Sequence, residues 1–353
     1  MADRMTPRER VLAVLNGEQP DEVPFTVYEC MIPQCAVERD LRNAGLCIVN
    51  RHHEGYTSQT PNCTRETRRY SEEGRPRVRT VVRTPVGEVS TVTEPAGDRE
   101  PFFTSWTLEP YFKGPEDYDV LLYMTRDKVY RPAYEAFARA ERWMGEDVIL
   151  RANVGSNPLH RIMGWMGLET FAVEWHGRRA RILELEAAMC ENKREVFRIV
   201  AGGPITHANF GGNMVPEVMG LERMEEFVLP LWDECAEVFH ANGKLLGSHM
   251  DGNNRAWADL IAGSRLDYIE AFTPAPDTDM TLAEALEAWP RKVLWVNFPS
   301  SVHVAGREKV RETAREIVEL GRRTNRVILG ITEDIPADRW QDNLLTISEA
   351  INA

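Results

Sequence analysis

Four short apolar segments decide the fold of this chain: KLLGSH at residues 244–249, LDYIEAF at 266–272, VLWVNF at 293–298 and RVILGI at 326–331. Each segment has the length and composition of a buried strand. Each is followed by a stretch with helical periodicity, at about 253–263, 281–289, 305–321 and 338–351. Alternation of this kind, with short connections, favours a parallel sheet whose faces are covered by helices.

The same alternation of strands and helices extends toward the N-terminus. Strands are predicted at 147–154 and 204–210, and helices at about 115–124, 129–143, 157–175, 179–200 and 222–241. Before them, Thr6 as N-cap, Pro7 and the stop at Gly17 predict a helix, and residues 23–29 read as a strand. About seven strands, most followed by a helix, predict an α/β fold that is a single (β/α)₈ TIM barrel. A doubly wound open sheet is the alternative, but no glycine-rich phosphate fingerprint follows the first strand.

Residues 30–110 interrupt this pattern. The stretch from about 30 to 75 is polar and poorly periodic, which indicates a long excursion from the barrel. Residues 77–92 mix β-branched and charged residues around Pro85-Val86-Gly87, a typical hairpin signal. We therefore expect one domain over 1–353, with an N-terminal extension and a β-hairpin insertion within about 30–110.

Composition narrows the classes of function. The 353 residues include 42 Lys and Arg against 55 Asp and Glu, a formal net charge of −13. Such an acidic chain is a poor candidate for binding nucleic-acid backbones, which requires a basic face. No apolar run reaches the roughly 18 residues of a membrane span, and residues 1–8 lack the apolar core of a signal peptide. Six cysteines without a CxxC pair favour a reducing cytoplasm. Oligomerisation with further copies of the chain stays open.

Polar residues gather at the predicted strand ends. In a barrel, function sits where the strands end, so these side chains are expected to converge on one mouth. They include Glu29, Arg151, Asn153, His207, Asn209, Asn213, His249, Asp251, Glu270, Asn297 and Glu333. A barrel built only for stability has no need of acids and imidazoles at so many strand ends.

The strongest indication of a metal site is the pair His249-x-Asp251. In an extended segment, residues two apart point to the same side, so both side chains can reach one ion. Imidazole with carboxylates suits zinc or a neighbouring divalent metal, and Glu333 or Glu270 would complete the ligand set. The alternative is structural: His249 and Asp251 pair with each other, or Asp251 caps the following helix.

Two other segments have both a functional and a structural interpretation. In residues 207–213, two glycines follow Phe210, so the backbone could approach a ligand closely. The same segment also reads as a turn with a buried aromatic. Asn297 ends the strand before Phe298-Pro299 and could contact substrate, or it could satisfy the backbone of a loop.

With these motifs in place, the chain resembles the uroporphyrinogen decarboxylase superfamily. The resemblance rests on residues 6–24, residues 204–213, the His249 strand, residues 297–299 and the closing GITEDIP at 330–336. It covers nearly the full chain, with 30–110 contributing least. It implies a (β/α)₈ barrel, in agreement with the alternation of strands and helices.

The resemblance implies one of two activities. Porphyrinogen decarboxylases of this superfamily need no cofactor and carry an arginine-rich segment after the first strand, where this chain has an acid, Glu29. Because an anionic mouth would repel a polycarboxylate, that activity is disfavoured. The other activity is zinc-dependent methyl transfer to or from a corrinoid protein. Its thiol-methylating members carry His-x-Cys and a later Cys, where this chain has His249-x-Asp251 and Glu333. Oxygen ligands leave the ion harder and more Lewis acidic, which suits an ether oxygen.

The resulting hypothesis is a corrinoid-dependent methyltransferase that demethylates a methoxylated, aromatic small molecule. The expected zinc ligands are His249, Asp251 and Glu333, with Glu29, His207 and Glu270 as catalytic residues. The expected substrate contacts are Asn209, Phe210, Asn213 and Asn297. No Asp-x-His-x-x-Gly motif is present, so the corrinoid must arrive on a partner protein. A cofactor-free decarboxylase or lyase, and a non-catalytic corrinoid- or tetrapyrrole-binding barrel, remain the alternatives.

Overall fold

The computed structural model describes residues 4–95 and 105–353, which form two compact units. The first unit comprises Met1–Gly55, Ala133–Gly155 and Val200–Ala353, and the second comprises Tyr56–Pro132 and Ser156–Ile199. The first unit is built around a sheet that holds every strand of the predicted barrel, and the second contains the antiparallel sheets. The expectation of one domain over 1–353 stays a prediction.

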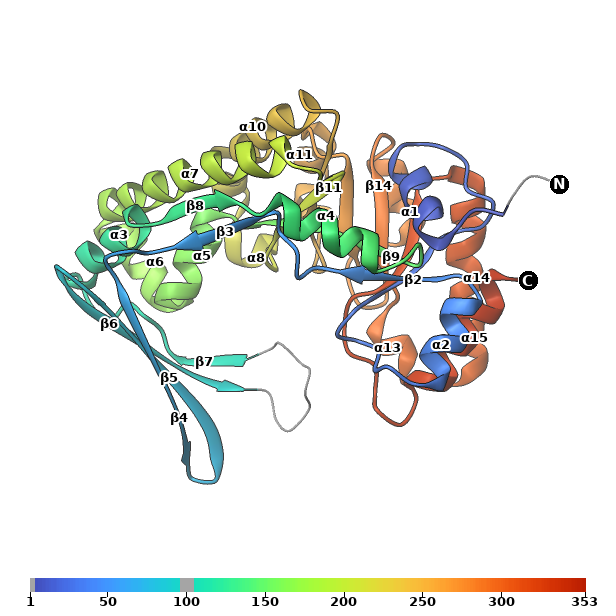
Figure 1. The fold of residues 1–353 in the computed structure, drawn as a ribbon, viewed down its shortest axis with the longest axis horizontal. Helices are drawn as coiled ribbons and strands as arrows, with labels where there is room; N and C mark the ends of the chain where they lie inside the picture. Colours follow the sequence, from blue (N-terminus) through green and yellow to red (C-terminus); the bar gives the residue numbers. More distant parts are fainter. Residues whose placement is uncertain (1–3, 96–104) are drawn as a thin grey trace. The chain divides into compact units, whose positions relative to one another are not determined.

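The sheet of the first unit is the barrel (Figure 1). Its strands lie in the order β10-β11-β12-β13-β14-β15-β1-β2-β9. Their bounds are β1 (Phe25–Tyr28), β2 (Leu46–Asn50), β9 (Val148–Leu150), β10 (Ala152–Ser156), β11 (His207–Gly211), β12 (Leu245–His249), β13 (Tyr268–Phe272), β14 (Val293–Asn297) and β15 (Val327–Ile331). The pairs from β11 to β15, and from β15 through β1 and β2 to β9, are parallel.

The two ends of this sheet belong to one interrupted strand. Only Arg151 separates β9, which pairs with β2, from β10, which lies beside β11. Counting β9 and β10 as one strand leaves eight around the sheet, as a TIM barrel requires. The predicted α/β barrel is therefore confirmed.

Helices precede and follow the barrel strands along the chain. They are α1 (Pro7–Leu15), α2 (Ala36–Asn43), α4 (Tyr134–Trp143), α8 (Pro216–Met219), α9 (Leu221–Arg223), α10 (Leu229–His240), α11 (Ala258–Gly263), α12 (Leu282–Ala288), α13 (Ser300–His303), α14 (Arg307–Thr324) and α15 (Trp340–Ile351). In α14 the buried residues Val310, Ala314, Ile317 and Gly321 recur at helical spacing, which gives one apolar face. As predicted, Thr6 caps α1, and its partner in a capping box is Glu9.

Large rings fill the part of the barrel where the strands begin. Tyr268 and Trp295 pack together in the core, with ring centroids 6.2 Å apart. The Tyr268 ring lies so close to Gly247 that a Cβ at that position would overlap it. Because these rings fill this end of the barrel interior, the polar side chains inside the barrel are expected to be functional where the strands end.

Several predicted boundaries were wrong. Residues 36–50, expected to belong to an excursion, form α2 and the barrel strand β2. The predicted helix 129–143 begins as strand β8 (Val129–Pro132), and only then becomes α4. The predicted helix 157–175 is two helices, because Gly167 adopts a positive φ of 78° that ends the first.

The second unit combines two antiparallel sheets with helices. Strand β3 (Tyr56–Gln59) pairs with β8, and β4 (Thr64–Glu72), β5 (Arg75–Thr84), β6 (Gly87–Pro95) and β7 (Ser105–Glu109) form a four-stranded sheet. The predicted hairpin is confirmed, because β5 and β6 pair on either side of the turn at Pro85-Val86. The helices are α3 (Asp117–Arg126), α5 (Pro158–Met166), α6 (Leu168–Gly177) and α7 (Arg179–Gly202), whose last turn belongs to the first unit. Among the described residues, no helix has the length and apolar character needed to cross a bilayer.

Candidate functional site

A single buried carboxylate, Glu270 on β13, organises the interior of the barrel. Its Oε2 accepts hydrogen bonds from His249 Nδ1 at 2.7 Å and from Asn209 Nδ2 at 3.2 Å. Its Oε1 lies 2.6 Å from Arg151 Nη1 and accepts a hydrogen bond from the Tyr28 hydroxyl. Four donors from four other strand positions therefore converge on one side chain that is shielded from water.

The backbone at this point is unusual. Ala271 has a φ of 58°, in the left-handed region that non-glycine residues seldom occupy, and the register between β13 and β14 shifts between Glu270 and Phe272. Such irregularities cost about 1–3 kcal/mol and re-aim the neighbouring side chain. The result is that Glu270 and Phe272 are both fully buried although they flank the kink.

Burial and hydrogen bonding act in opposite directions on Glu270. Loss of water raises the pKa of Glu270 above its ordinary value. The four donors and the positive charge of Arg151 favour the ionised carboxylate. Burial also lowers the pKa of Arg151, to about 10, which still leaves the guanidinium charged at neutral pH. We therefore treat the site as a buried ion pair with an ionised Glu270.

The second nitrogen of His249 faces another carboxylate. Because an ionised Glu270 can only accept, the His249 ring carries its proton on Nδ1. Its Nε2 then lies 3.3 Å from Asp251 Oδ2. In a neutral ring this would set a lone pair against a carboxylate oxygen. A cation between the two atoms would relieve that repulsion.

The geometry of His249 and Asp251 suits two ligands of one metal ion. In a tetrahedral zinc site with bonds of about 2.0–2.1 Å, two ligand atoms stand roughly 3.3 Å apart. A metal-bound histidine also characteristically donates its other ring N–H to a carboxylate, as His249 does to Glu270. Within residues 4–95 and 105–353, however, no three His, Cys, Asp or Glu side chains are already grouped to hold a metal. The chain thus presents a pair of ligands, not a completed set.

Glu333, the third expected ligand, follows β15 and is half-buried. Its Oε2 accepts a hydrogen bond from Ser300 Oγ at 2.9 Å. Burial raises the pKa of Glu333, and the negative charge of Asp251 raises it further while His249 lowers it. These influences show that Glu333 lies within electrostatic reach of the pair, although it is not in contact with it.

Glu29 directly follows β1 and is held by two side chains. Arg51 Nε is 3.3 Å from one of its oxygens, and His52 Nε2 is 3.3 Å from the other. The guanidinium of Arg51 also stacks on the Tyr28 ring, 3.6 Å from its centroid. Through Arg51, Glu29 is connected to the tyrosine that contacts Glu270.

The structure does not bring four other predicted site residues to this cluster. Because β11 begins three residues later than expected, His207 is its first residue, packed against Tyr268 and Trp295 where the strands begin. Burial lowers the pKa of His207 to about 3, so it is a neutral ring. Phe210 packs on Trp232 of α10, which is on the helix side of the strand. Asn213 is exposed in the loop after β11.

Asn297 binds the backbone of a loop, which was the structural alternative to contact with substrate. Its Nδ2 donates to Thr273 Oγ1 at 3.2 Å, and its Oδ1 accepts from the backbone N–H of Thr332 at 3.0 Å. Both polar ends of the amide are therefore occupied in tying together the ends of β13, β14 and β15. Contact with substrate by these four residues stays a prediction.

Sequence reasoning missed Tyr28, and it placed Arg151 among the strand-end residues without giving it a role. A tyrosine inside an apolar strand looks like ordinary core. Arg151 did carry a signal, because an arginine directly after the apolar run 148–150 is rare in a barrel strand unless a buried acid pairs with it. Only the fold reveals that this acid is Glu270, on a strand more than a hundred residues later.

No family model matches the chain, and no curated protein matches its sequence. Among solved structures, a methyltransferase from Methanosarcina mazei aligns with a TM-score of 0.58 at 11% identity, over 99% of this chain and 98% of the other. A structure of the pneumococcal virulence factor StrH (TM-score 0.35, 10% identity, 93% and 81% covered) is more distant. A glycoside hydrolase family 5 protein from Bacteroides vulgatus is equally distant, with a TM-score of 0.35 and 12% identity over 90% of this chain and 60% of the other. No argument rests on these two; the first likeness shows the fold alone, and it agrees with the barrel.

Proposed function

We propose that this chain is a metal-dependent methyltransferase that removes a methyl group from a methoxylated, aromatic compound and passes it to a corrinoid protein. The observation that carries the proposal is the environment of His249. Its Nδ1 is fixed by Glu270, and its Nε2 faces Asp251 at the separation of two zinc ligands. The name of the structural neighbour from Methanosarcina mazei, a methyltransferase, is the reason to choose methyl transfer among metal-assisted reactions.

In this proposal His249 and Asp251 would hold the ion, and Glu333 would be the third ligand. A bound zinc supplies Lewis acidity, which stabilises negative charge on the oxygen that loses its methyl group. Glu270 keeps the His249 ring in one tautomer and one orientation. The corrinoid is supplied by the partner protein.

The protein itself positions the substrate and excludes water. Asn209 Oδ1 is buried and has no hydrogen-bond partner among the described residues, so it can accept a bond from a substrate hydroxyl. Arg51 covers the Tyr28 ring and holds Glu29 at the end of β1, where Glu29 can give or take a proton at the leaving oxygen. The roles of Asn209 and Glu29 both depend on their positions at the ends of their strands.

The test is the metal content of the purified chain, with and without the proposed ligand. We expect near-stoichiometric zinc in the wild type and a sharp loss in His249→Ala, because the first shell loses its one imidazole. His176→Ala removes an exposed imidazole from α6 and should keep full zinc. Full zinc together with full methyl transfer in His249→Ala would show that the ligand assignment is wrong. If the wild type is free of zinc after purification and cannot take it up, a cofactor-free lyase becomes the favoured function.

A further inference from the structure

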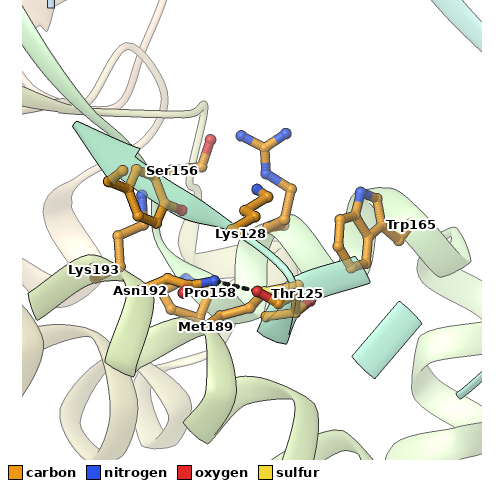
Figure 2. Close-up of a pocket in the computed structure, with 10 residues that line it drawn as sticks. Thr125, Lys128, Ser156, Pro158, Trp165, Met189, Asn192 and Lys193 are labelled. Carbon is orange, nitrogen blue, oxygen red and sulfur yellow. Dashed lines mark hydrogen bonds between the residues drawn. The ribbon is translucent and has the colours of Figure 1, made fainter. Parts of the chain in front are cut away.

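A pocket within the second unit has a chemistry of its own (Figure 2). Its cavity volume is about 60 Å³, and about 400 Å³ of empty space is present when the open solvent at its mouth is included, so the enclosed part has room for a small group such as a carboxylate. The end of α3, strand β8, the end of β10, and helices α5 and α7 each contribute to its walls. The side chains that matter for the argument are Lys128, Tyr130, Ser156, Arg161, Trp165 and Lys193.

The charge of this pocket is entirely positive. Lys128, Arg161 and Lys193 line it, and no Asp or Glu does. Among the described residues, neither Lys128 nor Arg161 has an ion pair or a side-chain hydrogen bond. Both side chains are exposed, so an anion from solution can reach them.

The electrostatics of Lys128 agree with this picture. Partial loss of water around its amine and the positive charges of Arg161 and Arg65 all lower the pKa of Lys128, although the residue as a whole is exposed. The nearest acidic influence on the pocket is Glu195, which acts on Tyr130 and does not line the cavity. An anion bound between Lys128 and Arg161 would relieve their mutual repulsion.

The remaining walls supply hydrogen bonds and apolar surface. The Ser156 hydroxyl faces the space, and burial raises the pKa of Tyr130 to about 12, so its hydroxyl keeps its proton and can donate. The Asn192 amide is already used, because it donates to the Thr125 carbonyl at 2.8 Å (Figure 2). Trp165, Met189 and Pro158 give the pocket an apolar side.

We propose that this pocket is a binding site for a small organic anion, whose carboxylate or phosphate group lies between Lys128 and Arg161 and whose apolar body lies against Trp165. Carboxylate and phosphate offer the same chemistry to two cations, namely oxygen atoms that accept charge-assisted hydrogen bonds. The proposal is independent of methyl transfer, because every residue in it belongs to the second unit.

The test is calorimetric titration of the full chain with sodium benzoate and, separately, with inorganic phosphate, both at constant ionic strength set by chloride. We expect one saturable site for at least one of the two. Lys128→Gln and Arg161→Gln should each weaken that binding about tenfold, the usual effect of losing one charge-assisted contact. Arg68→Gln removes an exposed, unpaired cation from β4 and should leave the affinity unchanged.

The outcomes separate the sources of the anion and the failures. Benzoate without phosphate identifies a carboxylate site with an apolar body, and phosphate alone identifies a phosphate site. Binding of neither overturns the proposal. Equal weakening in Arg68→Gln also overturns it, because the effect would then be the overall charge of the chain. Thermal unfolding of each variant verifies that it is folded before its affinity is compared.

Discussion

At the scale of single residues, the barrel interior depends on one ion pair. Glu270 and Arg151 are both shielded from water, and they form an ion pair with Oε1 2.6 Å from Nη1. A buried pair contributes little compared with apolar packing, but breaking it leaves a charge without a partner. The network of Tyr28, Asn209 and His249 around it is therefore both a structural element and the support of the candidate site.

Arg151→Met should destabilise the chain by about 3–5 kcal/mol, because Glu270 stays buried without its counter-charge. The double variant Arg151→Met with Glu270→Gln should recover part of that loss, since no unpaired charge remains. Urea unfolding of the wild type, both single variants and the double variant gives the coupling energy. Additive losses in the double variant would show that the two side chains do not act as a pair.

Asp251→Cys separates metal binding from the chemistry proposed for it. Thiolate is a good zinc ligand, so we expect the variant to keep its zinc. The softer ion would stabilise a developing phenolate less well, and demethylation should fall on the order of a hundredfold, equivalent to about 3 kcal/mol. Zinc content and methyl-ether turnover are measured on the same preparation. Unchanged turnover would contradict the argument that oxygen ligands tune the reaction.

At the scale of elements, helices and strands that are specified by neighbouring residues are predicted correctly, whereas those that depend on tertiary packing are not. The capped helix α1 and the hairpin of β5 and β6 are predicted correctly because each is specified by neighbouring residues. Helix α2 could not be recognised, since only Leu41 of its eight residues is buried and no apolar stripe exists. Strand β2 is five buried residues in a polar region, and only its place between β1 and β9 makes it a barrel strand.

The attachment of α1 to the following loop gives a pH-dependent prediction. The buried Arg10 guanidinium donates to Asp21 at 2.6 Å and holds the pKa of that carboxyl below its ordinary value. Its stabilising contribution is thus complete above the unfolded-state pKa of about 3.9 and is lost as the pH falls through the lower folded value. Asp21→Asn should cost about 1–2 kcal/mol at pH 7.

The same variant should lose its disadvantage in acid. The difference in unfolding free energy between the wild type and Asp21→Asn should begin to shrink below about pH 4 and should disappear once the pH is below the folded-state pKa of Asp21, where both proteins carry a neutral group at this position. Denaturant unfolding at a series of pH values follows that difference. Glu18→Gln, which removes an exposed carboxylate nearby that makes no ion pair, should show no comparable change between pH 7 and pH 3. A constant difference for Asp21→Asn across the range would contradict the role of the ion pair.

At the scale of the whole molecule, the sequence predicts the barrel better than the site. Alternation of strand and helix repeats along most of the chain, so a few misplaced boundaries do not alter the conclusion. The site depends on which side of each strand faces inward. His249, Asp251, Asn209 and Glu270 come together as expected, whereas Phe210 points to a helix and His207 lies at the opposite end of its strand. The start of β11 three residues later than predicted is enough to place His207 at the beginning of the strand, away from the candidate site.

The proposed reaction requires a second protein, which gives a prediction for the intact chain. The purified protein should be colourless, because no corrinoid-binding motif is present in it. Methyl transfer from a methoxylated aromatic compound should begin only when a reduced corrinoid protein or free cob(I)alamin is added. Absorption spectra and a transfer assay, each with and without cob(I)alamin, make the comparison. Co-purification of a tightly bound corrinoid would favour a binding protein over an enzyme.

The interrupted strand of β9 and β10 has a consequence for how the chain is made. Arg151 leaves the ribosome after Tyr28 but long before Glu270, and both of these residues contact it. Tyr28 and Glu270 are 242 residues apart in the sequence. At about 5–20 residues per second, Glu270 follows Arg151 after roughly ten seconds, and β15, the neighbour of β1, later still. All residues of the second unit have by then been synthesised. Arg151 therefore stays solvated until Glu270 arrives, and the nascent barrel keeps open strand edges until β15 pairs with β1, so we expect the risk of co-translational misassembly to end only with that last strand.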